Sequence, residues 1–318
     1  MGNNSGNEMT KLERVILAEP RGFCAGVDVA IDAVVRLAEE HPGEKIYVRH
    51  EIVHNIHAVN DLKEKHRAVF VENLSEIPEG SRVVFSAHGT SPEFYEEAKK
   101  RNLKVTDATC DLVRLVHAKV KKYHERRFEI ILIGHKGHQE VTGTMGYAPM
   151  HLVESVDDVG KLPIDKNRNV AYVTQTTLSK YDTKRIEEAL RDRFVNLIST
   201  KDDLCYATTN RQGAVMAIID KFKVGGFLVV GENNSSNSRS LVETAKQLGV
   251  KSHLLSTWKD IDQQWFNGIK DVGLTSGASV PEYLVGEVIE HLTKFFGAIV
   301  QTYVHKNEDI KFRPRILV

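Results

Sequence analysis

The sequence has little cysteine: only three of its 318 residues are cysteines, and they lie far apart. An odd number of widely spaced cysteines argues against a disulfide framework and indicates a reducing compartment, so we expect a cytoplasmic protein. No apolar run approaches the roughly 20 residues that span a bilayer, so we expect no membrane association. The start is rich in Asn, Gly and Ser and lacks a signal-peptide core, which predicts a disordered leader over residues 1–12.

A surplus of charge is also missing, because 43 Lys and Arg residues face 43 Asp and Glu residues. Without a basic surplus there is no long-range field to attract a polyanion, so we expect no nucleic-acid partner. There is no Gly-rich loop ending in Gly-Lys-Ser/Thr, which argues against nucleotide hydrolysis. The remaining composition, 41% hydrophobic and 27% charged, is ordinary for a globular protein. Nothing in it demands a subunit interface, and we expect a monomer.

Each cysteine stands between a strand pattern and a helix pattern. The apolar run 15–18 comes just before Cys24, and apolar residues at helical spacing follow it. Cys110 and Cys205 have the same setting, at separations of roughly 90 residues, which predicts a threefold repeat of small α/β units. The N-terminus of a helix favours a thiolate over a thiol.

Three converging thiolates suit zinc or an iron–sulfur cluster, and three ligands leave one coordination position open, as in catalytic sites. We favour a cluster. A zinc site completed by His135, His138 and Glu140 is one alternative. Another is that the cysteines are three unrelated buried thiols, the common role of free cysteine.

Strands and helices alternate throughout, which is typical of parallel α/β sheets, and ligands bind beyond the carboxyl ends of such strands. Small polar residues or histidines follow most of the predicted strands. Glu140 is the candidate proton donor, and Thr176 and Thr177 are candidates to orient it or a substrate hydroxyl. Candidate donors to an anion, which can also be plain helix caps or surface residues, are His54, His88, His138, Ser235, Ser236, Asn237 and Ser279.

A series of motifs, in order along the chain, resembles the 4-hydroxy-3-methylbut-2-enyl diphosphate reductase family. They include Pro-Arg-Gly-Phe-Cys-Ala-Gly-Val at 20–27, Gly-His-Lys-Gly-His-Gln-Glu-Val at 134–141 and Cys-Tyr-Ala-Thr-Thr-Asn-Arg-Gln at 205–212. The remaining matches are at 48–55, 85–89, 107–110, 174–179, 234–238 and 277–279.

The resemblance implies a pseudo-threefold trefoil of three parallel-sheet α/β units around a central iron–sulfur site. One [4Fe–4S] cluster would be held by Cys24, Cys110 and Cys205, with one open iron for the allylic hydroxyl of the substrate. We expect the units at 26–110, at 111–201 and at 13–25 plus 202–291, followed by a tail at 292–318 that folds back.

The implied activity is the last step of the methylerythritol phosphate route to isoprenoids. (E)-4-hydroxy-3-methylbut-2-enyl diphosphate would be reduced to isopentenyl and dimethylallyl diphosphate, with electrons from a small protein of the ferredoxin or flavodoxin type. Glu140 would relay protons, Thr176 would position the hydroxyl or a water, and Thr177 would contact the substrate. The diphosphate would be held by His54, His88, His138, Ser235, Ser236, Asn237 and Ser279.

Two other functions remain open: a non-redox iron–sulfur hydro-lyase, and a non-catalytic iron–sulfur redox sensor. A reductant requirement separates the first from the reductase, and the phosphate set with Glu140 argues against the second. Three positions depart from the family pattern, Asp111, Gln139 and Thr142, and none of them is a proposed ligand.

Overall fold

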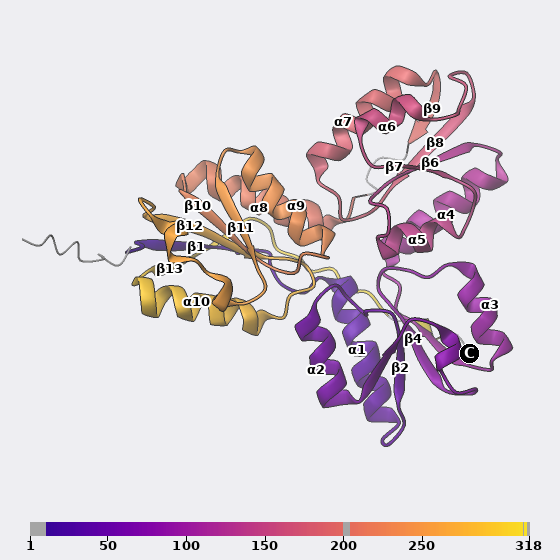
Figure 1. Cartoon of the computed structure of the whole chain (residues 1–318), viewed down its shortest axis with the longest axis horizontal. Helices are drawn as coiled ribbons and strands as arrows, with labels where there is room; N and C mark the ends of the chain where they lie inside the picture. Colours follow the sequence, from indigo (N-terminus) through magenta and orange to yellow (C-terminus); the bar gives the residue numbers. More distant parts are fainter. Residues whose placement is uncertain (1–10, 200–203, 314, 317–318) are drawn as a thin grey trace, which may run out of the picture. The chain divides into compact units, whose positions relative to one another are not determined.

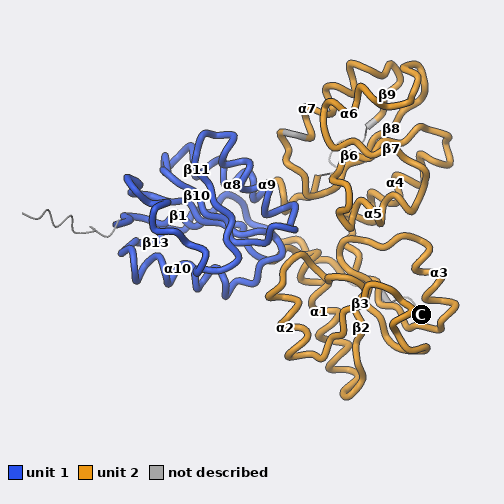
Figure 2. The backbone as a smooth tube through the Cα atoms, in the orientation of Figure 1, with its two compact units in different colours: residues 1–22, 210–308 blue, residues 23–209, 309–318 orange. Residues whose placement is uncertain are grey.

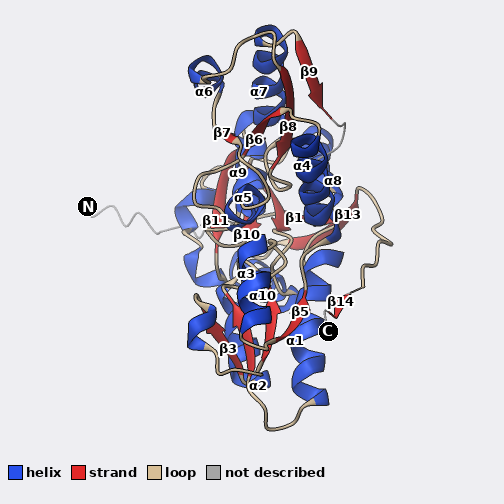
Figure 3. Cartoon of the chain, turned by 90° about the vertical axis from the view of Figure 1, so that its right-hand side faces the viewer, coloured by secondary structure: helices blue, strands red, loops and turns tan. Residues whose placement is uncertain are grey.

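The computed structural model describes residues 11–199, 204–313 and 315–316, and these residues form three β-sheets, each flanked by helices (Figure 1; Figure 3). Every strand pair is parallel except one short pair at the C-terminus. The predicted fold class, three parallel-sheet α/β units, is thereby confirmed. No helix in these ranges is long and apolar enough to cross a membrane.

The chain divides into two compact units (Figure 2). Unit 1 comprises residues 1–22 and 210–308, and unit 2 comprises residues 23–209 and 309–318. Unit 1 contains one sheet and unit 2 contains the other two. The finer domain boundaries expected from the sequence stay a prediction.

The sheet of unit 1 is covered by helices on both faces, and successive apolar side chains of its strands point to opposite faces. Val15 and Leu17 pack with the last long helix, α10, whereas Ile16 and Ala18 pack with α8 and α9 on the opposite face. Its strands, in spatial order, are β11 (Lys251–Leu255), β10 (Gly226–Val230), β12 (Asp271–Ser276), β1 (Arg14–Glu19) and β13 (Ile299–Val304). Its helices are α8 (Tyr206–Phe222), which begins in unit 2, α9 (Ser236–Gln247), α10 (Glu282–Phe296) and the 3₁₀ helices Trp258–Asp260 and Gln263–Phe266.

The first sheet of unit 2 has α1 and α2 on one face and α3 on the other. Its strands, in spatial order, are β14 (Arg315–Ile316), β5 (Lys104–Asp107), β4 (Arg82–Phe85), β2 (Ile46–Arg49) and β3 (Ala68–Val71). Its helices are α1 (Ala25–Glu40), α2 (Ile56–His66), α3 (Pro92–Lys100) and the 3₁₀ helix Leu74–Glu76.

The second sheet of unit 2 has α4 and α5 on one face and α6 and α7 on the other. Its strands, in spatial order, are β7 (His151–Val153), β6 (Glu129–Ile133), β8 (Asn169–Thr174) and β9 (Asn196–Ser199). Its helices are α4 (Asp111–Glu125), α5 (Gln139–Met145), α6 (Val156–Lys161) and α7 (Lys180–Arg193).

Two regions at the ends of the chain carry more structure than the sequence pattern indicates. Residues 1–10 of the predicted leader lie outside the described residues, but Leu12 is fully buried in the core of unit 1. In the predicted tail, β13 adds a strand beside β1, and β14 pairs antiparallel with β5. The tail therefore contributes a strand to a sheet in each unit.

Candidate active site

All three cysteines lie in unit 2, each immediately before a helix: Cys24 before α1, Cys110 before α4 and Cys205 before α8. In each case the cysteine carbonyl accepts the first helical hydrogen bond, at 2.9 Å for Cys24 and 3.0 Å for the other two. The backbone thus presents three thiols from three equivalent helix starts. The N-terminal helix dipole at each start favours an anionic sulfur or an anionic group bound near it.

The three thiols lie near one another, and each cysteine is half-buried. A Cβ atom placed on Gly26 would lie only 2.7 Å from Sγ of Cys110. Burial, with the neighbouring charges of Cys24 and Cys205, raises the pKa of the Cys110 thiol, and nearby backbone N–H groups act in the opposite direction. The helix start alone therefore does not make Cys110 a thiolate, contrary to the sequence expectation. A bound cation would, because coordination deprotonates a thiol.

A single metal ion does not have a ready site here. No three Cys, His, Asp or Glu side chains among the described residues are arranged as ligands to one ion. The residues around Cys110 are still compatible with a cofactor that is bound by the cysteine thiolates. Gly26 leaves room beside its sulfur that a side chain would fill, and the three thiols are close enough for their charges to interact.

Backbone hydrogen bonds tie two of the cysteines to the loops that carry other candidate residues. The N–H of Cys110 donates to the carbonyl of Ala87, next to His88, at 3.1 Å. The N–H of Cys205 donates to the carbonyl of Thr176 at 2.9 Å. The thiols and these loops are thus held in one local framework within unit 2.

The three candidate histidines form one group. His54 follows β2, His88 follows β4, and His138 follows β6, so they come from the carboxyl ends of strands in both sheets of unit 2. The ring centroids of His54 and His88 are 4.0 Å apart in a stacked pair. His138 meets these rings edge-on, at 5.0 Å from His54 and 6.0 Å from His88. The structure thus brings together all three histidines predicted to bind phosphate.

His88 is suited to donate a hydrogen bond as a neutral ring. Burial lowers the pKa of His88 well below 6.5, and the adjacent charges of His54 and His138 lower it further. Nδ1 of His138 accepts a hydrogen bond from the N–H of Glu140 at 3.2 Å, so the proton of the neutral ring is on Nε2. A neutral imidazole can bind an oxyanion through its N–H donor.

Glu140 is a carboxyl of the site whose pKa is shifted by its surroundings. It lies in the first turn of α5, is only 3% exposed, and accepts two hydrogen bonds from Thr176. The Thr176 N–H donates to Oε1 at 2.7 Å and the Thr176 hydroxyl donates to Oε2 at 3.0 Å. Burial raises the pKa of Glu140 to about 7, against the smaller opposing effect of these bonds. Glu140 can therefore hold or release a proton near neutral pH.

The loop after β8 contains a residue that the sequence analysis missed. Gln175 is 1% exposed, and its Nε2 donates to the Thr177 hydroxyl at 3.0 Å while its Oε1 accepts from the N–H of His135 at 3.0 Å. It thus joins the loops after β6 and β8. The available signal was a polar residue directly after a buried strand, inside the motif at 174–179.

The other candidate anion ligands form a second group, in unit 1. Ser235 caps α9, and its hydroxyl accepts from the N–H of Ser238 at 3.3 Å. Asn237 Oδ1 accepts from the N–H of Ala278 at 2.9 Å, which links the start of α9 to the loop after β12 that carries Ser279. The predicted residues Ser235, Ser236, Asn237 and Ser279 are all less than 9% exposed.

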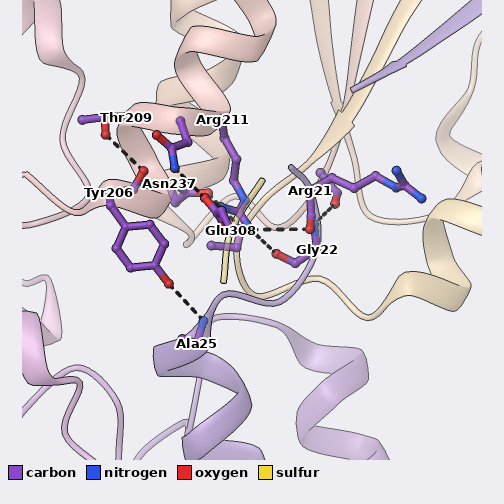
Figure 4. A network of polar contacts seen from close by, with 11 residues as sticks. Arg21, Gly22, Ala25, Tyr206, Thr209, Arg211, Asn237 and Glu308 are labelled. Atoms are coloured by element: carbon purple, nitrogen blue, oxygen red, sulfur yellow. Dashed lines mark hydrogen bonds and ion pairs between the residues drawn. The ribbon is translucent and has the colours of Figure 1, made fainter. Parts of the chain in front are cut away.

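A buried arginine, also missed from the sequence, organises the chain close to this second group (Figure 4). Arg211 is fully buried, and its Nη1 contacts both carboxylate oxygens of Glu308, at 3.2 and 3.1 Å. Its Nη2 donates to the carbonyl of Gly22 at 2.9 Å and to that of Arg21 at 3.4 Å. Gly22 adopts φ +65°, a conformation open chiefly to glycine.

The three departures from the family pattern lie beside the candidate ligands. Asp111 is the first residue of α4, and Arg114 lies 3.8 Å from it. Gln139 is the first residue of α5, and the Thr142 hydroxyl donates to the carbonyl of His138 at 3.2 Å. Arg114 also pairs with the buried Asp107 at 2.8 Å, so it offsets only part of the extra negative charge that Asp111 brings next to Cys110.

Comparison with known proteins places the sequence among well-characterised relatives. Residues 15–293 match the family described as LytB protein. A 4-hydroxy-3-methylbut-2-enyl diphosphate reductase of Actinobacillus pleuropneumoniae serotype 3 is 51% identical over 284 residues, which are 87% of this chain and 89% of the relative. The enzyme of the same name from Mycobacterium ulcerans is 49% identical over 303 residues, 94% of this chain and 90% of the relative.

Solved structures agree with the sequence relatives. The E-1-hydroxy-2-methyl-but-2-enyl-4-diphosphate reductase of Plasmodium falciparum superposes with a TM-score of 0.89 at 40% identity, covering 94% of each chain. A second structure, of (E)-4-hydroxy-3-methyl-but-2-enyl diphosphate reductase, the terminal enzyme of the non-mevalonate pathway, has a TM-score of 0.62 at 30% identity. It covers 89% of this chain and 100% of the other. By its family match, its sequence identity and its fold, the chain belongs to the LytB protein family.

Proposed function

We propose that the chain is a 4-hydroxy-3-methylbut-2-enyl diphosphate reductase. It would convert (E)-4-hydroxy-3-methylbut-2-enyl diphosphate to isopentenyl and dimethylallyl diphosphate at the end of the methylerythritol phosphate pathway. Family membership supports this activity, and the strongest structural support is one buried pair of residues. Glu140 is buried in the first turn of α5, two residues after His138, and it bonds Thr176, whose carbonyl accepts from the N–H of Cys205.

The proposed cofactor is one [4Fe–4S] cluster on Cys24, Cys110 and Cys205, with one iron free to bind the substrate. When bound, such a cluster passes on electrons and acts as a Lewis acid toward an oxygen ligand. The support is the shared helix-start geometry of the three cysteines and their charge interaction. We further propose a ferredoxin- or flavodoxin-type electron donor, a monomeric state and a cytoplasmic location.

The overall reaction is balanced by two electrons and two protons. The allylic C–O bond breaks, the hydroxyl leaves as water with one proton, and the second proton adds to an allyl carbon. In this account Glu140 delivers protons, since its pKa of about 7 keeps a protonated fraction at neutral pH. The Thr176 hydroxyl, held by Glu140 at 3.0 Å, would orient the substrate hydroxyl or the departing water.

The diphosphate is proposed to bind to neutral donors rather than to lysines. His54, His88 and His138 supply imidazole N–H groups from unit 2. By the family resemblance, the proposed ligands also include Ser279 and the residues Ser235, Ser236 and Asn237 at the N-terminus of α9, where backbone N–H groups and the helix dipole favour an anion. Thr177, held by Gln175, completes the proposed substrate contacts.

The variant Glu140→Gln tests this proposal. Glutamine has the shape of glutamate and can still bond Thr176, but it cannot release a proton, so we expect turnover to fall by two orders of magnitude or more. Iron content and substrate binding should stay at the wild-type level. The matched control is Glu125→Gln, an exposed position at the end of α4, which should keep full activity.

Two results would count against the proposal. Full turnover in Glu140→Gln would remove Glu140 from proton delivery. Conversion of the substrate without any reductant would favour the hydro-lyase, in which an open iron acts only as a Lewis acid.

A further inference from the structure

A tyrosine links two of the cysteine-bearing helix starts within unit 2. Tyr206 directly follows Cys205, and its hydroxyl oxygen accepts a hydrogen bond from the N–H of Ala25 at 3.3 Å (Figure 4). Ala25 directly follows Cys24 and is the first residue of α1. The first N–H groups of a helix have no acceptor within the helix. The tyrosine hydroxyl supplies an acceptor to the N–H of Ala25, which phenylalanine could not do.

The C-terminal segment of the chain contacts this tyrosine and the third cysteine segment. We define the C-terminal strap as residues 309–313 together with β14. Phe312, in the strap, meets the ring of Tyr206 edge-to-face, with centroids 6.5 Å apart and an interplanar angle of 77°. The strap then ends on β5, where β14 pairs antiparallel with Thr106 and Asp107. Cys110 follows three residues after the end of β5.

The strap therefore contacts the segment of each cysteine, either directly or through Tyr206. Loss of a bound cluster begins when a ligand segment opens locally, and such opening is rarer where backbone and side-chain contacts hold the segment closed.

We propose that the C-terminal strap braces the three cysteine segments and so retains the iron–sulfur cluster, with Tyr206 as the positioning residue. Tyr206 acts through Ala25 and Cys205 and does not itself bind the cluster. The inference rests on the proposed function, because it assumes a cluster on these cysteines. It adds that retention of the cluster depends on residues outside the ligand set.

The test measures how fast iron is released to a chelator from anaerobically loaded protein. Tyr206→Phe removes only the hydroxyl, and Phe312→Ala removes the ring that packs on it. The loss of one net hydrogen bond or of one aromatic pair is worth about 1 kcal/mol, about a fivefold change in an opening equilibrium. We therefore expect iron release to be about fivefold faster in each variant. Phe312→Leu, which keeps an apolar contact, should restore part of the wild-type rate.

The matched control is Tyr303→Phe in β13. Tyr303 also meets a phenylalanine edge-to-face, Phe222, at 5.6 Å and 78°. It belongs to unit 1, whereas all three cysteines belong to unit 2, so iron release should stay at the wild-type rate. The double variant Tyr206→Phe/Phe312→Ala should release iron more slowly than the product of the single effects predicts, because both changes act through the same residue, Tyr206.

The cluster reduction potential, titrated by electron paramagnetic resonance, provides a second readout that general destabilisation would not move. We expect it to shift in Tyr206→Phe and to stay unchanged in Tyr303→Phe. Wild-type iron release and potential in both Tyr206→Phe and Phe312→Ala would overturn the inference and leave the proposed function intact. Wild-type protein that binds no cluster would overturn both. Because a chain cut after residue 308 can fail to fold, these point variants carry the test.

Discussion

The side chain of Glu140 is an acid whose strength is set by two opposing effects. Burial removes the water that would stabilise the carboxylate, and two hydrogen bonds from Thr176 stabilise it in part. Burial dominates, and the pKa is about 7 instead of the usual 4.5. Since the folded state then binds the proton more tightly than the unfolded chain, this carboxyl contributes most stability at low pH. The contribution is lost as the pH rises from 4.5 to 7.

We predict that Thr176→Val raises the pKa of Glu140 above 7. Valine keeps the size of threonine and the backbone N–H bond, but it removes the hydroxyl that stabilises the carboxylate. The protonated carboxyl can be followed by its infrared carbonyl band as a function of pH, with Glu140→Gln as the blank. The control is Thr177→Val, because Thr177 bonds Gln175. A midpoint near 4.5 in wild type, or equal shifts in both variants, would contradict the account.

At the scale of elements, the site depends on how closely α1 approaches the start of α4. Gly26 lies in the first turn of α1, and its missing side chain leaves space for the sulfur of Cys110. The requirement is steric, since Gly26 has no positive φ and alanine is otherwise the better helix former. The approach of the two elements thus depends on a single missing methyl group.

We predict that Gly26→Ala lowers the iron content of anaerobically purified protein to below half of the wild-type value. The new methyl group would lie 2.7 Å from Sγ of Cys110 and must displace it. Gly286→Ala serves as the control, because Gly286 is an exposed residue of α10 with nothing within 4 Å of an added Cβ. That control should stabilise the protein by about 0.5–1 kcal/mol. Wild-type iron content in Gly26→Ala would contradict the predicted approach.

The elements themselves were predictable to different degrees. Central strands such as β1, β6 and β10 are continuous apolar runs because both faces of each sheet are covered, and the sequence pattern predicted them. Edge strands such as β13, with its exposed and half-buried residues, carry no such pattern. Their pairing comes from the neighbouring strand, which a local pattern cannot reveal.

In the candidate site, too, some residues were predictable from the local sequence and others were not. The cysteines, the histidines and Glu140 stand in local motifs next to strand ends, so the sequence indicated them. Gln175, Tyr206 and Arg211 act through partners distant in sequence, and Tyr206 and Ala25 are 181 positions apart. Their roles follow from tertiary contacts, which the sequence signals only for Gln175, by its place directly after a buried strand.

At the scale of the whole molecule, the chain passes between its two units three times, after Gly22, after Thr209 and after Glu308. Within unit 1, Arg211 bonds the carbonyl of Gly22 and the carboxylate of Glu308, so one buried guanidinium joins all three chain ends there (Figure 4). Asn210 adds a bond to Glu308 at 3.0 Å. Unit 1 thus holds its three connections in one polar network.

We predict that Glu308→Ala lowers the free energy of unfolding by about 3–5 kcal/mol, because it leaves the charge of Arg211 buried without its carboxylate. Urea unfolding of the full chain measures this. The control Glu290→Ala removes an exposed partner of Lys294 and should have no measurable effect. Replacing both members, in Arg211→Met/Glu308→Met, should recover much of the loss. A loss in Glu308→Ala no larger than in the control would mean that the network does not hold unit 1 together.

The central claim is that three helix-start cysteines hold a redox cluster that reduces an allylic diphosphate. Its most direct test is to measure iron and acid-labile sulfide per chain in anaerobically purified protein. Dithionite-driven conversion of (E)-4-hydroxy-3-methylbut-2-enyl diphosphate is then followed in the same sample. We predict about four irons and four sulfides per chain, lost in Cys24→Ser, and two electrons consumed per isopentenyl or dimethylallyl diphosphate formed. Stoichiometric zinc without sulfide, or no conversion by cluster-loaded protein, would contradict the account.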